Sequence, residues 1–238
     1  MHAHFFGQSS FATHAVANQR NIVNIETEIP LKIAAPFGCG IQTGAGAVIN
    51  VLRAPAGGSI AVFGAGAVGL SAVAAARVVG CSNIIAVDIN PARLEAARDL
   101  GATQTIDAST GDSAELVLRS KPGGVDFTLE TSGSPAVFRQ AVDCLAPTGV
   151  CGLIGAPAFG TEVTFDINTI LVGGLTIRGI VEGDSVPQVF LPTLFALWKD
   201  GRFPMERIMR FDDFDQIDEA AQDAAAGRVI KPVLLMDD

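Results

Sequence analysis

The sequence predicts an α/β protein with a doubly wound, parallel β-sheet. Short apolar runs alternate with segments suited to helices, glycines follow several of those segments, and a glycine-rich turn comes directly after the first run. An apolar run without polar alternation is typical of a strand that is buried on both faces of a sheet. Strands that alternate with helices imply right-handed crossovers, which place helices on both faces of a parallel sheet.

The predicted elements follow one another along the middle of the chain. The strands are expected at residues 59–63, 83–87, 103–106, 125–129, 150–154 and 175–179. The helices are expected between them, at residues 70–79, 91–100, 112–119 and 135–145. Asn90 and Pro91 begin the second helix as its N-cap and first residue, and Gly101 ends it.

The two ends of the chain have a different pattern. Residues 1–36 indicate strands and turns, with one strand at 11–16, whereas 186–200 predict an amphipathic helix and 231–236 a closing strand. No turn or cap precedes the first expected strand, so we expect a truncated protein. The predicted division of the chain is a sheet domain at 44–179 and a second, mainly β domain made of 1–43 and 180–238.

Composition and charge disfavour several function classes. The chain has 238 residues, of which 49% are hydrophobic and 17% charged, a balance typical of a globular protein rather than a disordered one. Its formal net charge of −9 would repel nucleic-acid phosphates and anionic lipid, so we expect no nucleic-acid and no membrane partner. The cysteines lack CxxC spacing and no secretion signal is visible, which favours a reducing, cytoplasmic setting. They are Cys39, Cys81, Cys144 and Cys151.

The glycine-rich turn, residues 64–69, has the pattern GxGxxG between a predicted strand and a predicted helix. In a Rossmann-type sheet, the first glycine, here Gly64, allows a tight turn. The second, Gly66, lets the backbone approach a pyrophosphate, and the third, Gly69, lets helix and strand pack closely. The unpaired N–H groups at the start of the helix favour a bound anion. The turn therefore predicts a dinucleotide site.

Asp88 ends the next predicted strand, roughly 20 residues after the turn, where a carboxylate can accept hydrogen bonds from both ribose hydroxyls. A carboxylate at this place would repel a 2′-phosphate, so the sequence favours NAD over NADP as cofactor. The alternative is an ordinary aspartate that caps a loop. Arg93 is a candidate contact on the ribose or adenine side, with an exposed helix arginine as the alternative.

Segments around this turn resemble zinc-dependent medium-chain alcohol dehydrogenases. Residues 38–47, Gly-Cys-Gly-Ile-Gln-Thr-Gly-Ala-Gly-Ala, are similar to the GCG and TGxGA motifs of that family. Residues 4–12 are similar to its aryl- or benzyl-alcohol dehydrogenase branch, and 87–90 and 227–232 also match. The resemblance covers essentially the whole chain, and it implies that the second domain is the remnant of a GroES-like catalytic domain.

The resemblance implies roles for individual residues. Cys39 matches the third protein ligand of the catalytic zinc, and Thr43 matches a residue beside the nicotinamide. Lys231 matches a basic residue at the pyrophosphate. Phe5 and Phe6 match the apolar wall of an alcohol pocket, and ordinary core phenylalanines are the alternative. The residues implied to line the cofactor are Val68, Ser132, Ile154 and Ala156.

The sequence departs from the family at its metal site. The family's first two zinc ligands, a cysteine and a histidine, and its proton relay would lie before Met1, and the cysteine cluster of a structural zinc is absent. His2, His4 and His14 do not have a ligand spacing relative to Cys39. We therefore expect Cys39 to be a buried free thiol, and we expect zinc in the parent enzyme but not in this chain.

The leading hypothesis is an NAD-dependent, zinc-type dehydrogenase that oxidises an aromatic primary alcohol to its aldehyde. This chain would be the cofactor-binding portion, which binds NAD(H) with little or no activity of its own. Two alternatives stay open: a non-catalytic module for nucleotide binding and dimerisation, and a zinc-independent relative of the quinone reductases. The cysteine at position 39 weakens the second alternative.

Residues 168–179 are apolar and strand-prone. At the edge of a sheet such a segment would be an exposed template for pairing with another chain. In the family that the sequence resembles, this region pairs across a two-fold axis, so we expect a homodimer or a larger homo-oligomer. A helix and a strand internal to one subunit are the alternative.

Overall fold

The computed structural model describes residues 14–25 and 28–236 of the chain. Six strands form one parallel sheet in the order β3-β2-β1-β4-β5-β6. This order reverses direction between β1 and β4, as in a doubly wound fold, and it confirms the predicted class. The strands are β1 (Ser59–Phe63), β2 (Asn83–Asp88), β3 (Gln104–Asp107), β4 (Val125–Glu130), β5 (Leu145–Leu153) and β6 (Thr176–Gly179).

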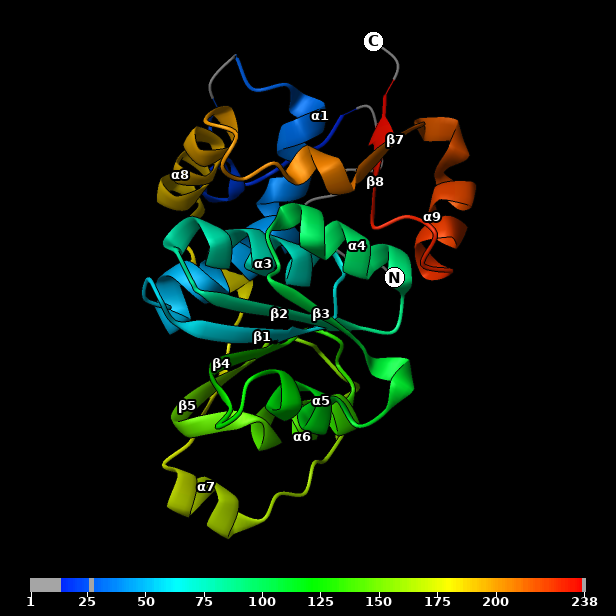
Figure 1. Cartoon of the computed structure of the whole chain (residues 1–238). Helices are drawn as coiled ribbons and strands as arrows, with labels where there is room; N and C mark the ends of the chain where they lie inside the picture. The colour runs from blue at the N-terminus through cyan, green and yellow to red at the C-terminus, as the bar shows by residue number, and fades with distance from the viewer. Residues whose placement is uncertain (1–13, 26–27, 237–238) are drawn as a thin grey trace.

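Helices cover both faces of the sheet (Figure 1). One face carries α3 (Ala67–Val79) and α4 (Pro91–Leu100), and the other carries α5 (Ser113–Ser120) and α6 (Pro135–Asp143). All five residues of β1 are buried, because this central strand has helices above and below it. The hydrophobic residues accordingly form two clusters, one on each side of the sheet.

The start and stop signals of α4 act as predicted. The Asn90 side chain accepts a hydrogen bond of 3.0 Å from the backbone N–H of Ala92, and Pro91 is the first helical residue. Gly101 ends the helix with a φ of 115°, in the left-handed region that glycine adopts at little cost. These local signals fix where β2 ends and α4 begins, which is the region that carries Asp88.

The segment before the sheet is helical rather than extended. Residues 14–25 form no strand, only the short 3₁₀ turn η1 (Gln19–Asn21), and the expected strand at 11–16 lies partly outside the described residues. The prediction of strands up to residue 36 is therefore wrong for the described part. Pro30, which has no N–H to give to a ladder, is the N-cap of α1 and starts a helix at the apolar run that follows. The elements here are α1 (Leu31–Ala34), η2 (Ala35–Gly38), α2 (Gly40–Gly46) and the π-helical η3 (Ala47–Leu52).

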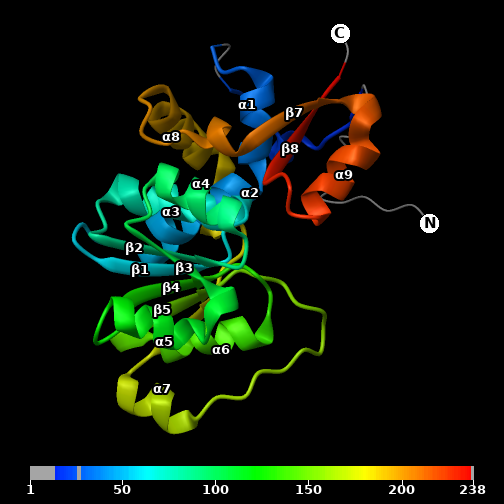
Figure 2. The same cartoon turned by 45° about the vertical axis from the view of Figure 1, so that its right-hand side comes forward.

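The C-terminal segment returns to the same side of the molecule as α1. The predicted helix and closing strand are both present, as α8 (Pro187–Lys199) and β8 (Lys231–Leu235). Figure 2 shows α1, α8 and the β7–β8 pair gathered at the end of the molecule opposite to α7 (Ile167–Gly173). The remaining elements are η4 (Ala108–Thr110), η5 (Glu182–Asp184), η6 (Met205–Ile208), β7 (Met209–Asp213), η7 (Phe214–Gln216) and α9 (Ile217–Ala225).

Two further features bear on partners. The apolar segment 168–179 forms most of α7 and the whole of β6, and β6 is an edge strand of the sheet. Within the part of the chain that the structure describes, no helix combines the length and the hydropathy needed to cross a bilayer.

Candidate functional site

The glycine turn between β1 and α3 has the three properties that a pyrophosphate seat needs. Gly64 has a φ of 94°, which a residue with a side chain rarely adopts. A Cβ on Gly69 would overlap the carbonyl oxygen of Gly64, so only glycine lets α3 approach the turn. A Cβ on Gly66 would meet nothing within 4 Å, and no side chain caps the start of α3. The turn thus leaves open space at a helix N-terminus, where an anion is stabilised.

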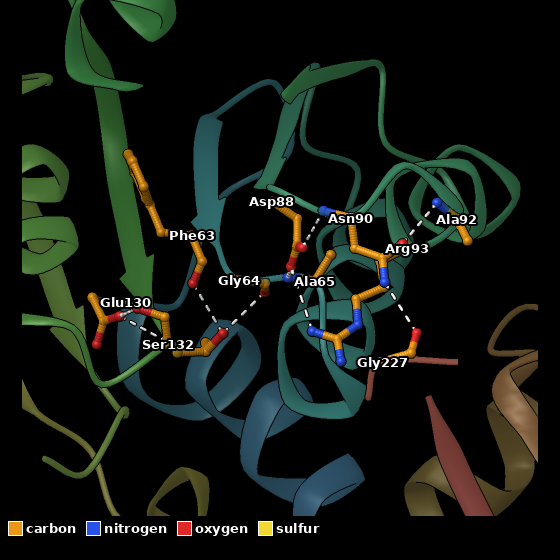
Figure 3. A network of polar contacts seen from close by, with 11 residues as sticks. Phe63, Gly64, Ala65, Asp88, Asn90, Ala92, Arg93, Glu130, Ser132 and Gly227 are labelled. Carbon is orange, nitrogen blue, oxygen red and sulfur yellow. Dashed lines mark hydrogen bonds and ion pairs between the residues drawn. The ribbon is translucent and has the colours of Figure 1, made fainter. Parts of the chain in front are cut away.

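Asp88 ties the end of β2 to this turn (Figure 3). Its Oδ2 atom accepts a hydrogen bond of 2.6 Å from the N–H of Ala65, and its Oδ1 atom accepts one of 2.8 Å from the N–H of Asn90. The residue is 8% exposed, yet each carboxylate oxygen keeps a further lone pair for a ligand hydroxyl. The carboxylate therefore stands beside the turn, as a ribose-binding residue must.

Arg93 lies over the same carboxylate rather than extending into solvent (Figure 3). Its Nη1 atom is 4.0 Å from Asp88 Oδ2, and its side chain is 27% exposed. Its Nε atom is buried and has no hydrogen-bond partner within the described chain, so it is free to donate to a bound group. The side chain of Asn90 donates to the carbonyl of Gly227 at 3.0 Å, which brings the segment before β8 up to this subsite.

The ends of β4 and β5 are joined by Glu130, a residue that the sequence analysis did not single out. Its carboxylate is fully buried and accepts hydrogen bonds from the N–H and hydroxyl of Ser132 and from the N–H of Gly133. The backbone N–H of Ile154 donates to the Glu130 carbonyl at 2.9 Å. Ala156 is exposed and lies against Gly133. The predicted cofactor residues at these two strand ends therefore form one continuous edge.

A second cluster lies on α2 and the loop after β6. The Thr43 hydroxyl donates to the Cys39 carbonyl at 2.9 Å and lies 3.3 Å from Glu182 Oε2. The Cys39 thiol donates to Glu182 Oε1 at 3.4 Å, and the side-chain amide of Gln42 donates to Glu182 Oε2 at 3.2 Å. Glu182 thus connects the two residues that the resemblance placed at the reaction centre. Sequence reasoning missed it because 139 positions separate it from Thr43 and no motif marks it.

Val68 and Lys231 connect this cluster to the dinucleotide seat. Val68, in the first turn of α3, has a methyl group 3.6 Å from the place of a Cβ on Gly40 of α2. Lys231 shares a pocket of about 620 Å³ with Ala67, the residue that follows Gly66. Burial and Glu182 raise the pKa of Cys39, and the positive charge of Lys231 is near enough to oppose that rise in small part. The predicted site residues that the structure describes therefore surround one region, while Phe5 and Phe6 lie outside the described residues.

The described donor set does not fit a zinc ion. Cys39 is exposed, so the expectation of a buried thiol is wrong; the residue lies at the junction of η2 and α2. Glu182 is the carboxylate beside it, and no group of three or more histidine, cysteine, aspartate or glutamate residues able to hold a metal occurs within residues 14–25 and 28–236. A tightly held zinc needs three or four such ligands.

The dinucleotide, in contrast, fits the residues present. The open space at Gly66, the uncapped N-terminus of α3 and the buried, unpartnered Nε of Arg93 each offer what a phosphate or a ribose requires. Asp88 contributes acceptors only, which suits hydroxyl groups and disfavours a phosphate. The residues that would hold a dinucleotide are therefore those of the turn together with Asp88 and Arg93.

The reactivity of Cys39 provides a first test of this cluster. Although the residue is exposed as a whole, partial burial of its thiol raises the pKa of Cys39 above the ordinary value, and the charge and hydrogen bond of Glu182 raise it further. The Glu182→Gln variant should therefore lower the pKa of Cys39 and speed its alkylation near neutral pH, because thiolate is the reactive form. Rates of iodoacetamide alkylation measured against pH test this, with Asp184→Asn as the control.

The other cysteines do not obscure that measurement. Cys81, Cys144 and Cys151 are buried, and burial raises the pKa of Cys144 to about 12 and that of Cys151 to about 11. A Cys39→Ser variant should therefore lose the fast alkylation. A pH profile that is identical in the wild type and Glu182→Gln would contradict the contact between Glu182 and the thiol.

Comparison with known proteins agrees with this geometry. The model of the zinc-binding dehydrogenase family matches residues 67–197. This range begins with α3, includes the strands β2 to β6 and ends within α8. Geraniol dehydrogenase of Castellaniella defragrans is 42% identical over 232 residues, covering 97% of this chain and 62% of that enzyme. The chain thus spans less than two thirds of the length of that relative.

Two solved structures have a closely similar backbone over nearly the whole chain. Benzyl alcohol dehydrogenase from Acinetobacter calcoaceticus aligns with a TM-score of 0.96 at 46% identity, over 98% of this chain and 64% of that one. An alcohol dehydrogenase zinc-binding domain protein from Burkholderia ambifaria aligns with a TM-score of 0.96 at 51% identity, over 98% of this chain and 63% of that one. The sequence-based resemblance is confirmed, and the chain belongs to the zinc-binding dehydrogenase family.

Proposed function

We propose that this chain is the dinucleotide-binding portion of an NAD-dependent dehydrogenase that oxidises an aromatic or terpene primary alcohol to its aldehyde. The observation that carries the proposal is the glycine turn, with open space at Gly66 and the Asp88 carboxylate hydrogen-bonded to the turn at Ala65. When bound, the nicotinamide ring accepts the hydride. The substrate class rests on the names of the benzyl alcohol and geraniol dehydrogenases that the chain resembles.

The role of the chain's own residues in this function is to bind and orient. The turn and the N-terminus of α3 hold the pyrophosphate, with Lys231 as a point charge nearby. Asp88 accepts hydrogen bonds from the ribose hydroxyls, and its charge selects NAD over NADP by repelling the 2′-phosphate of NADP. Thr43 and Val68, which line the junction of α2 and α3, shape the place of the nicotinamide. No step is assigned to a metal, because the described donor set does not fit one.

Binding and turnover measured on the same preparation test the proposal. Isothermal titration calorimetry should show one site per chain for NAD(H) and much weaker binding of NADP(H). With NAD, benzyl alcohol or geraniol and added zinc, we expect little NADH formation, since Cys39 is the one residue that the resemblance assigns as a zinc ligand. Failure to bind NAD(H) would refute the proposed function, and robust turnover would refute the expected inactivity of this chain.

A binding and assembly module without chemistry is the second candidate, because the described residues include no group of three metal-binding side chains. Metal analysis of the purified protein separates the two. Stoichiometric zinc that survives dialysis against a weak chelator favours a working active site, and zinc lost under those conditions favours the module.

We also propose that two copies associate through α7 and β6. The edge strand β6 is exposed along its whole length, and Val172 on α7 is 84% exposed. Pairing of this edge with a second copy would satisfy its free backbone groups and cover apolar side chains. Multi-angle light scattering at micromolar concentration should therefore show a dimer for the wild type.

A matched pair of charge substitutions localises this interface. Val172→Glu should shift the protein toward monomer, because it places a charge in the proposed contact. Ile89→Glu is the control, since Ile89 is also an exposed apolar residue, at 71%, but it lies after β2, away from α7. A wild type that is monomeric, or dimers disrupted equally by both variants, would contradict the proposed interface.

A further inference from the structure

The loop after β6 has an unusual backbone. Three successive residues adopt a positive φ: Glu182 at 51°, Gly183 at 65° and Asp184 at 47°. For the two residues that carry side chains this conformation is costly, and such strain persists only where the surrounding structure enforces it. Neighbouring elements must therefore hold this loop in its left-handed conformation.

Contacts from three directions hold the loop in place. Gly183 lies so close to Gly46 of α2 that a Cβ on Gly46 would come within 2.6 Å of the Gly183 carbonyl oxygen. The side-chain amide of Asn50 donates to that same carbonyl at 3.2 Å. The carboxylate of Asp184 forms an ion pair of 2.7 Å with Arg178, at the exposed edge. The packing of α2 against the loop thus fixes the left-handed conformation.

The result of this conformation is the direction of one carboxylate. Glu182 is half-buried, and its two oxygens accept hydrogen bonds from Gln42 and Cys39 and lie within reach of the Thr43 hydroxyl, along one face of α2. Gln42 is 2% exposed, and its Oε1 atom has no partner within the described chain. The neighbouring acid, Asp184, points away to Arg178 instead. A single negative charge is therefore held against α2 by a strained and tightly packed loop.

The topology of the sheet places this charge beside one end of a bound dinucleotide. In a doubly wound sheet the ligand lies across the carboxyl ends of the strands, around the point where the strand order reverses. Asp88, at the end of β2, marks the adenosine half, and the turn after β1 marks the pyrophosphate. The nicotinamide half of the dinucleotide must then lie toward the carboxyl ends of β4, β5 and β6. Glu182 follows the end of β6 by three residues.

We propose that Glu182 is a specificity residue that favours the oxidised form of the cofactor over the reduced form. This inference rests on the proposed function. The oxidised nicotinamide ring carries a positive charge and the reduced ring is neutral, so a nearby carboxylate stabilises only the oxidised form. Because the carboxylate is half-buried, solvent and salt screen this attraction less than at an open surface. The residue thereby strengthens binding of NAD⁺ relative to binding of NADH.

Affinities for both forms, measured by calorimetry and by NADH fluorescence, test the role of Glu182 without any turnover. In Glu182→Gln, which keeps the size of the side chain and one acceptor oxygen but removes the charge, NAD⁺ should bind about tenfold more weakly, as expected for the loss of one nearby charge, while the affinity for NADH should change less than twofold. Asp184→Asn is the matched control. It removes an equal charge only two residues after Glu182, but from a side chain that faces Arg178 instead of α2. Its ratio of the two affinities should equal that of the wild type.

The outcomes separate this inference from the proposed function. If the wild type binds neither form, the proposed function fails. If Glu182→Gln weakens both forms equally, or if Asp184→Asn changes the ratio as much, Glu182 is not the charge that discriminates. Thermal unfolding without ligand verifies that both variants fold. Glu182→Asp keeps the charge and should therefore retain most of the preference for NAD⁺ over NADH. If this variant lost that preference completely, the inference would also be overturned.

Discussion

Replacing Gly69 by alanine is expected to destabilise the protein strongly and to abolish dinucleotide binding. A Cβ at this position would overlap the carbonyl oxygen of Gly64 and would also come within 3.3 Å of the Thr131 hydroxyl. A backbone carbonyl cannot rotate away as a side chain can, so α3 would have to move from the sheet. Overpacking a core typically costs 1–3 kcal/mol, and this collision with backbone should cost about 3 kcal/mol or more.

Gly66→Ala is the matched variant, since it adds the same methyl group to the same turn. The space around Gly66 is open, and its φ of −76° suits an alanine, so the fold should tolerate the change within about 0.5 kcal/mol. The methyl group would, however, occupy the space into which the pyrophosphate must come. We therefore expect Gly66→Ala to unfold like the wild type but to bind NAD at least tenfold more weakly.

Urea unfolding and calorimetric titration on both variants distinguish the two roles. The expected pattern is loss of stability in Gly69→Ala and loss of affinity alone in Gly66→Ala. Equal stability of the two variants would show that the close approach of α3 to the turn is not required. Unchanged affinity in Gly66→Ala would show that the open space is not where the pyrophosphate binds.

The sheet was predictable because its signals are local. The strand at 59–63 was placed with its observed bounds, and the helix that follows Asn90 begins and ends where its cap, Pro91 and Gly101 indicate. Buried parallel strands are apolar throughout, so each one is visible as a short run. The glycine turn was visible for the same reason, since its glycines lie within six positions of one another.

The helix α2 could not be predicted in the same way. Its sequence, GIQTGAG, contains three glycines, which individually disfavour a helix. The structure shows why they are there: a Cβ on Gly44 would overlap the Val68 carbonyl, and one on Gly46 would crowd Gly183. Close packing against α3 and against the loop after β6 outweighs helix propensity, and that packing depends on residues far away in the sequence.

The contact between Glu182 and α2 has the same origin. A glutamate before a glycine in a polar loop is indistinguishable, in one sequence, from an ordinary surface residue. Its relation to Cys39 and Thr43 arises only when the end of β6 is brought against α2. By contrast, Glu130 had a usable local signal, because Glu-Thr-Ser-Gly directly follows a predicted strand in the same way that Asp88 ends another.

Asp88→Asn is expected to have the second large effect, on affinity and on the choice of cofactor. The side chain keeps its shape but only one acceptor oxygen, so one of the two hydrogen bonds that the N–H groups of Ala65 and Asn90 now donate to the carboxylate, at 2.6 and 2.8 Å, is lost together with the charge. Hydrogen bonds to a charged group contribute about 1.5–3 kcal/mol, so NAD should bind tenfold to a hundredfold more weakly. NADP should lose less affinity, because the charge that repels its 2′-phosphate is gone.

Asp107 provides the control for this substitution. It lies directly beside Asp88 in the register between β2 and β3, at the same edge of the sheet, but its carboxylate bonds the N–H and hydroxyl of Ser109. Asp107→Asn removes an equal charge from a neighbouring strand end without touching the glycine turn. If calorimetry gave the same loss of NAD affinity and the same change in the NAD to NADP ratio for both variants, general charge at this edge would account for the selectivity. A loss of NAD affinity confined to Asp88→Asn, together with a lower preference for NAD over NADP, shows instead that this one carboxylate acts at the ribose, whereas an equal loss for NAD and NADP would point to its hydrogen bond with the turn at Ala65.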